Sequence, residues 1–261
     1  MTGTPDVAAL RRGAHERAAG RPRRPFAGAV EDAAHAGVAT RRYTPDRRHP
    51  GAAAVFLHGG YGLFGDVELQ DGWCRRAAEA LGVVLLSVDY RLAPEATLDE
   101  SVADALAGVE LLAGEGSHRL YLAGDSAGGA VAIAAAARTD RDLAGLLLTN
   151  PNLDLSLETY DDALPGGPGR ELSAFAMRAW TGVEPAAAPR LHRSAAGLPP
   201  TVVAVGALDS LLPEARALAA SCRRDGVPCR LVELPGAEHG FVATERAGEV
   251  LAEAGAFFGL G

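Results

Sequence analysis

The hydrophobic pattern of the chain predicts short buried strands that alternate with helices. Compact apolar runs of this length are typical of parallel strands covered on both faces. Strands are expected at residues 38–43, 52–57, 82–88, 120–123, 143–149, 201–205 and 229–234. Helices are expected at residues 67–81, 99–113, 129–137, 213–225 and 242–258. This alternation predicts an α/β fold with a mostly parallel central sheet, helices on both faces, and functional residues at the carboxyl ends of strands.

The first 37 residues do not follow this pattern and are expected to form an N-terminal appendage or small cap. A helix is predicted at residues 6–19 and one or two helical turns at residues 26–35, with a proline-containing break between them. The arginines of this break could bind an anionic partner, but a solvated linker face is the favoured interpretation. Residues 38–261 then form the main domain.

A long insert at residues 150–198 interrupts the main domain and contains one clear helical pattern, at residues 171–180. Irregular segments of this length within a compact domain are usually functional lids or disordered. A lid over the functional site is favoured. Its residues Phe175, Met177 and Trp180 either line a substrate pocket or pin the lid to the body of the protein.

The clearest chemical motif is Gly124-Asp-Ser-Ala-Gly128, which follows the apolar run at residues 120–123 and precedes a helix. Strand, sharp turn and helix are the context that the G-x-S-x-G motif requires. The glycines allow the chain to reverse without steric clash, so Ser126 is presented at the tip of the turn. A glycine-rich turn with an incidental serine is the alternative, and a nucleophilic Ser126 is favoured.

Three polar residues follow the ends of three separate predicted strands, namely Ser126, Asp209 and His239. A serine hydroxyl becomes a good nucleophile when a neutral imidazole takes its proton. A carboxylate behind the imidazole fixes its tautomer and stabilises the imidazolium. The order Ser, Asp, His along the chain is that of the α/β-hydrolase arrangement. The sequence therefore predicts a catalytic triad.

A glycine-rich turn, His58-Gly-Gly-Tyr-Gly62, follows the strand at residues 52–57. A phosphate-binding P-loop would need a following Gly-Lys-Ser/Thr, which this turn lacks. Glycines let the backbone approach a ligand closely with its N–H groups pointing inward. The turn is therefore interpreted as an oxyanion-binding site.

Composition excludes several classes of protein. The formal charge of −8 and pI near 5.4 argue against a nucleic-acid partner. Three cysteines without CxxC spacing predict neither a disulfide framework nor a zinc site. No apolar stretch is long enough for a membrane span and the N-terminus lacks a signal-peptide core, so a cytoplasmic protein is expected.

These motifs together resemble the hormone-sensitive lipase-like esterases of the α/β-hydrolase fold, from about residue 55 to the end of the chain. The resemblance depends on five motifs in order along the sequence: His58-Gly-Gly-Tyr61 followed by Gly65-Asp66, Asp89-Tyr-Arg-Leu-Ala-Pro-Glu95, Gly124-Asp-Ser-Ala-Gly-Gly129, Gly206-Ala-Leu-Asp209 and His239-Gly-Phe241.

The resemblance implies Ser126 as nucleophile, His239 as base and Asp209 as the residue that orients it. It also implies an oxyanion hole built from Gly59, Gly60, Tyr61 and Ala127. Substrate-pocket walls are expected at Phe64, Phe175 and Trp180. Tyr61 departs from the family, which usually has a third glycine there. The N-terminal cap is shorter than the family's, so acyl-group selectivity cannot be carried over.

The sequence thus predicts a serine carboxylic-ester hydrolase that acts through an acyl-enzyme on small to medium acyl esters. The expected partner is a small-molecule ester, and no metal or organic cofactor is needed. A specialised acyl hydrolase or cyclase of secondary metabolism could use the same triad. A non-catalytic binding protein on this scaffold, like the plant gibberellin receptors, is the other alternative, and the presence of His239 argues against it.

Overall fold

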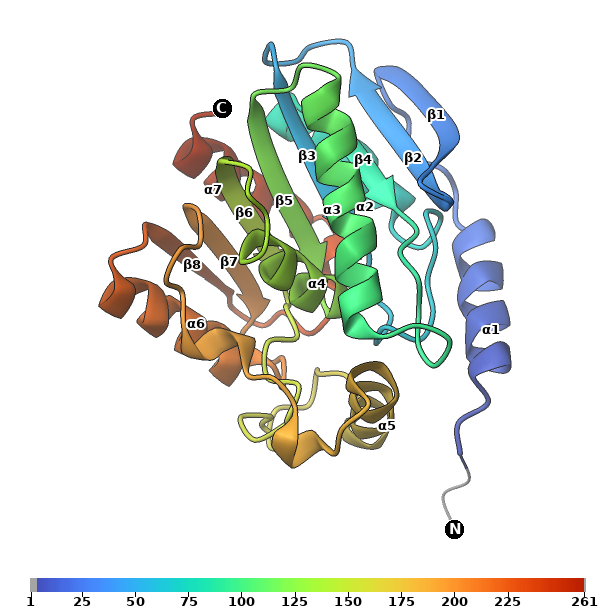
Figure 1. Ribbon diagram of the computed structural model, residues 1–261, viewed down its shortest axis with the longest axis vertical. Coiled ribbons are helices and arrows are strands. Elements are labelled where there is room, and N and C mark those ends of the chain that lie inside the picture. Colours follow the sequence, from blue (N-terminus) through green and yellow to red (C-terminus); the bar gives the residue numbers. More distant parts are fainter. Residues whose placement is uncertain (1–3, 261) are drawn as a thin grey trace.

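The computed structural model describes residues 4–260 as an eight-stranded sheet flanked by helices (Figure 1). The strand order is β1-β2-β4-β3-β5-β6-β7-β8, and all neighbours from β4 to β8 run parallel. β1 and β2 extend this sheet as antiparallel edge strands. The strands are β1 Gly28–His35, β2 Val38–Pro45, β3 Ala52–Leu57, β4 Val84–Val88, β5 Arg119–Asp125, β6 Leu143–Thr149, β7 Thr201–Gly206 and β8 Cys229–Leu234.

Helices cover both faces of the sheet, as the sequence pattern predicts, and each face has its own hydrophobic core. One core joins the sheet to α3, α4 and α6, and the other joins it to α2 and α7. The α-helices are α1 Val7–Ala19, α2 Asp71–Leu81, α3 Leu98–Gly114, α4 Ala127–Ala136, α5 Arg170–Thr181, α6 Leu212–Asp225 and α7 Ala247–Phe258. Short 3₁₀ helices lie at Pro185–Ala187, Leu191–Arg193 and Phe241–Ala243.

The prediction of helical turns at residues 26–35 is wrong, because strand β1 occupies residues 28–35. It pairs along its whole length with β2, and His35 lies opposite Val38. The connecting Ala36 and Gly37 both have positive φ, at 52° and 82°, as a two-residue hairpin turn requires. The boundary expected after residue 37 therefore falls at a hairpin turn, and β1 belongs to the central sheet.

The insert at residues 150–198 packs firmly against the body of the protein. The side chains of Met177 and Trp180 in α5 are fully buried. The indole Nε1 of Trp180 donates to Ser101 Oγ of α3 at 3.0 Å, and its ring stacks against Tyr90. Figure 1 shows the insert and α5 beyond the carboxyl ends of the strands.

Helix α1 lies along one side of the molecule, apart from the sheet (Figure 1), and buries only Ala14 and Ala18. Polar contacts hold it in place. Arg11 donates to the carbonyls of Leu63 and Ala93, and His15 Nδ1 lies 2.7 Å from Asp66 Oδ2. Side-chain polarity, rather than apolar burial, thus docks this helix against the main domain.

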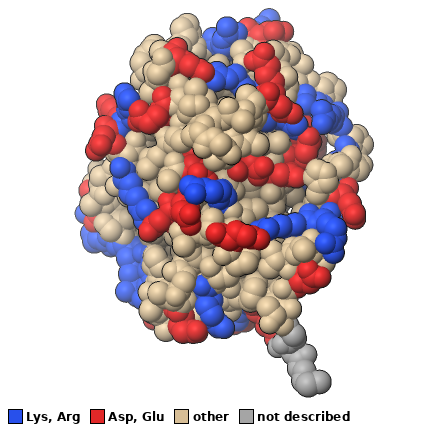
Figure 2. Space-filling model, turned by 45° about the vertical axis from the view of Figure 1, so that its right-hand side comes forward, with Lys and Arg blue, Asp and Glu red and all other residues tan. Residues whose placement is uncertain are grey.

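On the face that Figure 2 shows, acidic and basic side chains are interspersed and form no extended patch of one sign. None of the helices within residues 4–260 combines the length and the apolar character that a membrane crossing requires.

Candidate active site

The turn between β5 and α4 presents Ser126 in a strained backbone conformation, with φ 53° and ψ −117°. Such a conformation is costly for a residue with a side chain and persists only where the surroundings enforce it. Two flanking glycines make the turn possible. A Cβ on Gly124 would lie 2.2 Å from the carbonyl oxygen of Gly128, and one on Gly128 would lie 2.0 Å from that of Leu57. The motif therefore folds as the sequence predicts, with Ser126 directly before α4.

The structure brings Ser126, His239 and Asp209 together from three strand ends. His239 Nε2 lies 3.0 Å from Ser126 Oγ, and His239 Nδ1 lies 2.7 Å from Asp209 Oδ2. Asp209 is fully buried, and its other oxygen accepts a hydrogen bond from the Leu211 amide at 3.0 Å. The histidine is therefore aligned to take a proton from the serine through Nε2 while its Nδ1–H donates to the carboxylate.

Electrostatics at this site favour a charged histidine. Burial by itself lowers the pKa of His239, but the hydrogen bond and the negative charge of Asp209 outweigh it, so the pKa is raised above its ordinary value. Burial also raises the pKa of Asp125, the residue before the serine, although His239 and two hydrogen bonds oppose this. An imidazolium formed by proton transfer would thus be stabilised by a buried carboxylate.

The turn after β3 places the predicted oxyanion donors beside the serine. Gly60 has φ 118°, and a Cβ there would lie 1.9 Å from the Phe64 carbonyl oxygen, so the position needs glycine. Tyr61 has φ 62°, a left-handed conformation that a side chain can adopt at some cost. The amides of Gly60, Tyr61 and Ala127 have no hydrogen-bond acceptor within residues 4–260. These three N–H groups are available to a ligand.

Gly59 does not fit the predicted oxyanion hole, because its amide is already engaged. Its N–H donates to Gln70 Oε1 at 2.8 Å, while Gln70 Nε2 donates to Asp125 Oδ2 at 2.7 Å. Gln70 therefore bridges the glycine-rich turn and the serine turn. Nothing in the sequence pattern marks this residue, since its role depends on the two distant segments that it joins.

A cavity of about 670 Å³ opens beside Ser126 and His239. Its size is in the range of small-molecule binding pockets. Tyr61 and Phe64 line it, as expected for Phe64. Its other walls come from the end of α1, from residues 21–24, from residues 68–73 with Arg76, and from Gly240, Val242 and Ala243.

The expected pocket residues Phe175 and Trp180 do not line this cavity, and neither does any other described residue of the insert. Trp180 is fully buried between Tyr90, Ser101 and the backbone of Gly62. Phe175 packs against the hydrophobic core that contains α3 and α4. Of the two roles considered for these aromatic residues, the structure supports pinning of the insert. The cavity wall that we expected from the insert is formed instead by the end of α1 and the polar residues that follow it.

Within residues 4–260, no group of three or more His, Cys, Asp and Glu side chains is arranged to hold a metal ion.

Comparison with known proteins, like the geometry of the site, indicates an esterase of the α/β-hydrolase fold. A family model described as alpha/beta hydrolase fold matches residues 54–243. Esterase LipI of Mycobacterium tuberculosis is 31% identical over 228 residues, which cover 78% of this chain and 71% of that protein. An acetyl-hydrolase of Streptomyces hygroscopicus is 29% identical, covering 80% of this chain and 74% of its own.

Solved esterase structures share the fold over nearly the whole chain. The crystal structure of EstE5, soaked with p-nitrophenyl butyrate, is 25% identical with a TM-score of 0.84 and covers 98% of this chain and 91% of its own. The hyperthermophilic esterase of the archaeon Pyrobaculum calidifontis is 26% identical with a TM-score of 0.81, covering 97% and 93%. The family model, the esterase relatives and the fold together confirm the resemblance drawn from the motifs, and the chain belongs to the hormone-sensitive lipase-like esterases of the α/β-hydrolase family.

Proposed function

We propose that this esterase hydrolyses carboxylic esters of small to medium acyl groups, with Ser126 as nucleophile, His239 as general base and Asp209 as the residue that orients it. The hydrogen-bonded chain from Ser126 Oγ through His239 to Asp209, with distances of 3.0 and 2.7 Å, carries the proposal. A protein that only binds its ligand has no need for an imidazole aligned on a strained serine.

In the first half of the reaction, Ser126 Oγ attacks the ester carbonyl carbon while its proton passes to His239 Nε2. The carbonyl oxygen becomes an oxyanion, which accepts hydrogen bonds from the free amides of Gly60, Tyr61 and Ala127. Donors fixed in advance at such a position stabilise the transition state more than the ground state. His239 then gives its proton to the leaving alcohol, and an acyl-enzyme remains on Ser126.

In the second half, a water molecule loses a proton to His239 and attacks the acyl carbon. The tetrahedral intermediate collapses, the acid departs, and His239 returns the proton to Ser126 Oγ. Every step uses groups of this chain and water, so neither a metal nor an organic cofactor is needed. The cytoplasmic location and the lack of a nucleic-acid partner stay predictions from the sequence.

Turnover of p-nitrophenyl acetate and butyrate, together with labelling by a fluorophosphonate probe, tests the proposal. We expect the wild type to hydrolyse both esters and to be labelled. Ser126→Ala should abolish turnover and labelling, whereas Ser194→Ala, at an exposed serine outside the site, should keep both. Labelling of Ser126→Ala at the wild-type rate would refute the assignment of the nucleophile. A folded wild type without turnover of any ester would refute the activity.

A further inference from the structure

Four arginines line the same cavity as Ser126, namely Arg21, Arg23, Arg24 and Arg76. This grouping is unusual in a chain whose formal net charge is −8. Three carboxylates also line the cavity, those of Glu68, Asp71 and Asp125. Whether the arginines can attract a ligand therefore depends on which of them the carboxylates already neutralise.

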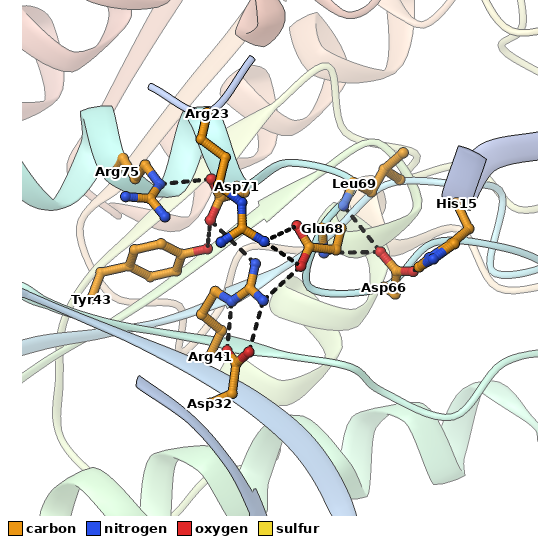
Figure 3. A network of polar contacts seen from close by, with 10 residues as sticks. All are labelled: His15, Arg23, Asp32, Arg41, Tyr43, Asp66, Glu68, Leu69, Asp71 and Arg75. Atoms are coloured by element: carbon orange, nitrogen blue, oxygen red, sulfur yellow. Dashed lines mark hydrogen bonds and ion pairs between the residues drawn. The ribbon is translucent and has the colours of Figure 1, made fainter. Parts of the chain in front are cut away.

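Three of these seven residues, Arg23, Glu68 and Asp71, belong to one internal network, which Figure 3 shows. Arg41 lies 2.6 Å from Asp32, 2.7 Å from Glu68 and 3.3 Å from Asp71. Arg75 binds Asp71 at 2.7 Å, and Arg23 reaches Glu68 at 3.1 Å from the cavity side. Three guanidinium groups thus balance three carboxylates, and Arg23 is the only cavity arginine that this network uses.

Arg21 and Arg24 have no carboxylate partner within residues 4–260. Arg21 Nη1 donates to the Leu69 carbonyl oxygen at 3.1 Å, which leaves its charge uncompensated. Arg24 makes no hydrogen bond or ion pair with any described residue. Arg76 does have a partner, Glu245, but that side chain is 94% exposed and the pair is weakened by solvent. Arg21 and Arg24 therefore add to the cavity wall two positive charges that no described carboxylate pairs with.

The backbone holds these two arginines at the cavity. Pro22 follows Arg21 and Pro25 follows Arg24, and each proline fixes its own φ and restricts the residue before it. The contacts of Arg21 with Leu69 and of Arg23 with Glu68, together with the bond from the Ala27 amide to Glu79 at 2.8 Å, fasten both ends. Such anchoring lowers the entropic cost of placing a guanidinium group against a ligand.

We propose that Arg21 and Arg24 form an anion subsite of the ester cavity, so that this enzyme prefers esters that carry a free carboxylate at the end remote from the reacting carbonyl. The planar guanidinium matches a carboxylate in shape and charge. This inference rests on the proposed function, since the same cavity holds the ester at Ser126. The carboxylate can belong to the acyl part or to the alcohol part of the substrate, and the experiment separates these two.

The test compares each anionic ester with its neutral carboxamide counterpart of nearly equal size. Mono-ethyl terephthalate and ethyl 4-carbamoylbenzoate place the group on the acyl side. 4-Acetoxybenzoate and 4-acetoxybenzamide place it on the alcohol side. The measured quantity is the ratio of kcat/KM for the anionic ester to that for the amide. Comparing this ratio between protein variants cancels the intrinsic reactivity of the esters.

We expect Arg24→Gln and Arg21→Gln each to lower this ratio about three- to fivefold on at least one side of the ester, as fits exposed ion pairs. Arg24→Glu should lower it further. In the wild type, added salt should lower the ratio because it screens exposed charges. Arg17→Gln is the matched control, because this exposed arginine of α1 lies against Gly13 and outside the cavity.

An unchanged ratio on both sides in Arg24→Gln and Arg21→Gln, or an equal fall in Arg17→Gln, would overturn the subsite. Calorimetry with 4-carbamoylbenzoate, which has a carboxylate and no ester, gives a second readout. Its binding should be weaker in Arg24→Gln than in the wild type and Arg17→Gln, and equal binding in all three would also overturn the subsite. This measurement needs no turnover, so failure of the subsite and failure of the esterase activity are distinguishable.

Discussion

Gln70 joins the turn that holds the oxyanion donors to the turn that holds the nucleophile, and we predict that Gln70→Met lowers both stability and turnover. Its amide oxygen accepts from the Gly59 N–H at 2.8 Å, and its amide nitrogen donates to Asp125 Oδ2 at 2.7 Å. Thr149 Oγ1 holds the other oxygen of Asp125 at 2.6 Å. Met has nearly the same size as Gln and can make neither hydrogen bond.

The two lost hydrogen bonds set the size of the effect. A neutral hydrogen bond contributes about 1 kcal/mol and one to a carboxylate about 1.5–3 kcal/mol, so we expect a loss of about 2–4 kcal/mol in the free energy of unfolding. For a chain of this length this lowers the melting temperature by about 4–8 °C. If the turn shifts, the amides of Gly60 and Tyr61 no longer meet the oxyanion. Loss of one such donor costs kcat on the order of 100-fold, with KM little changed.

A second variant, Gln70→Glu, separates positioning from simple destabilisation. Glu keeps an acceptor for the Gly59 amide but places a carboxyl group against Asp125. Two adjacent carboxylates raise one another's pKa, so the pair keeps one proton up to a higher pH than an isolated carboxyl would. The protonated pair can restore the bridge. The kcat of this variant, relative to wild type, should therefore be higher at pH 5.5 than at pH 8.5.

The assay is hydrolysis of p-nitrophenyl butyrate, with kcat and KM measured separately between pH 5.5 and 8.5, alongside thermal unfolding. A Met variant with wild-type kcat and melting temperature would refute the reasoning. So would a Glu variant whose kcat, relative to wild type, does not change with pH, because a purely structural defect would not follow the protonation of this pair.

Two further predictions concern the triad and the insert. In Asp209→Asn, kcat/KM should fall on the order of 10⁴-fold because the histidine loses the partner that fixes its tautomer. Because Asp209 raises the pKa of His239 against the effect of burial, the remaining activity should reach half its plateau at a lower pH than in the wild type, and a pH–rate profile measures this midpoint. Trp180→Phe removes a buried hydrogen bond and part of a buried ring, so thermal unfolding should show a melting temperature lower by about 4 °C. Its kcat/KM for p-nitrophenyl esters should be unchanged, since Trp180 lies outside the cavity, and a selective loss for longer acyl chains would contradict that placement.

The arrangement of the catalytic residues follows from local patterns that the sequence contains. Ser126 comes directly after β5, and Asp209 and His239 lie in the loops that follow β7 and β8; the carboxyl ends of these parallel strands meet at one edge of the sheet. Glycines at positions 124 and 128 mark the serine turn because only glycine fits there. Most of the parallel strands are compact apolar runs, which is why their positions along the chain could be predicted without the structure.

The predictions from the sequence fail at residues whose structure or role depends on contacts with residues far away along the chain. Strand β1 has a helix-compatible composition and becomes a strand by pairing with β2 across Ala36 and Gly37. Trp180 is a large aromatic residue of the kind that lines pockets. It is buried instead, where its indole N–H donates to Ser101, 79 residues earlier in the chain. Gln70 acquires its role from Gly59 and Asp125, and no pattern of apolar and polar positions encodes such a bridge.

The catalytic chemistry and the substrate cavity therefore depend on different kinds of contact. Buried hydrogen bonds at the ends of the sheet hold the triad, whereas exposed polar contacts hold the α1 wall. The hydrogen bond of His15 with Asp66 raises the histidine's pKa, so the stabilisation from this pair is lost as the pH rises through that raised value. Salt weakens the exposed ion pairs in the same wall. Changes in pH, salt or the N-terminal residues should thus alter which esters the enzyme accepts before they alter how it cleaves them.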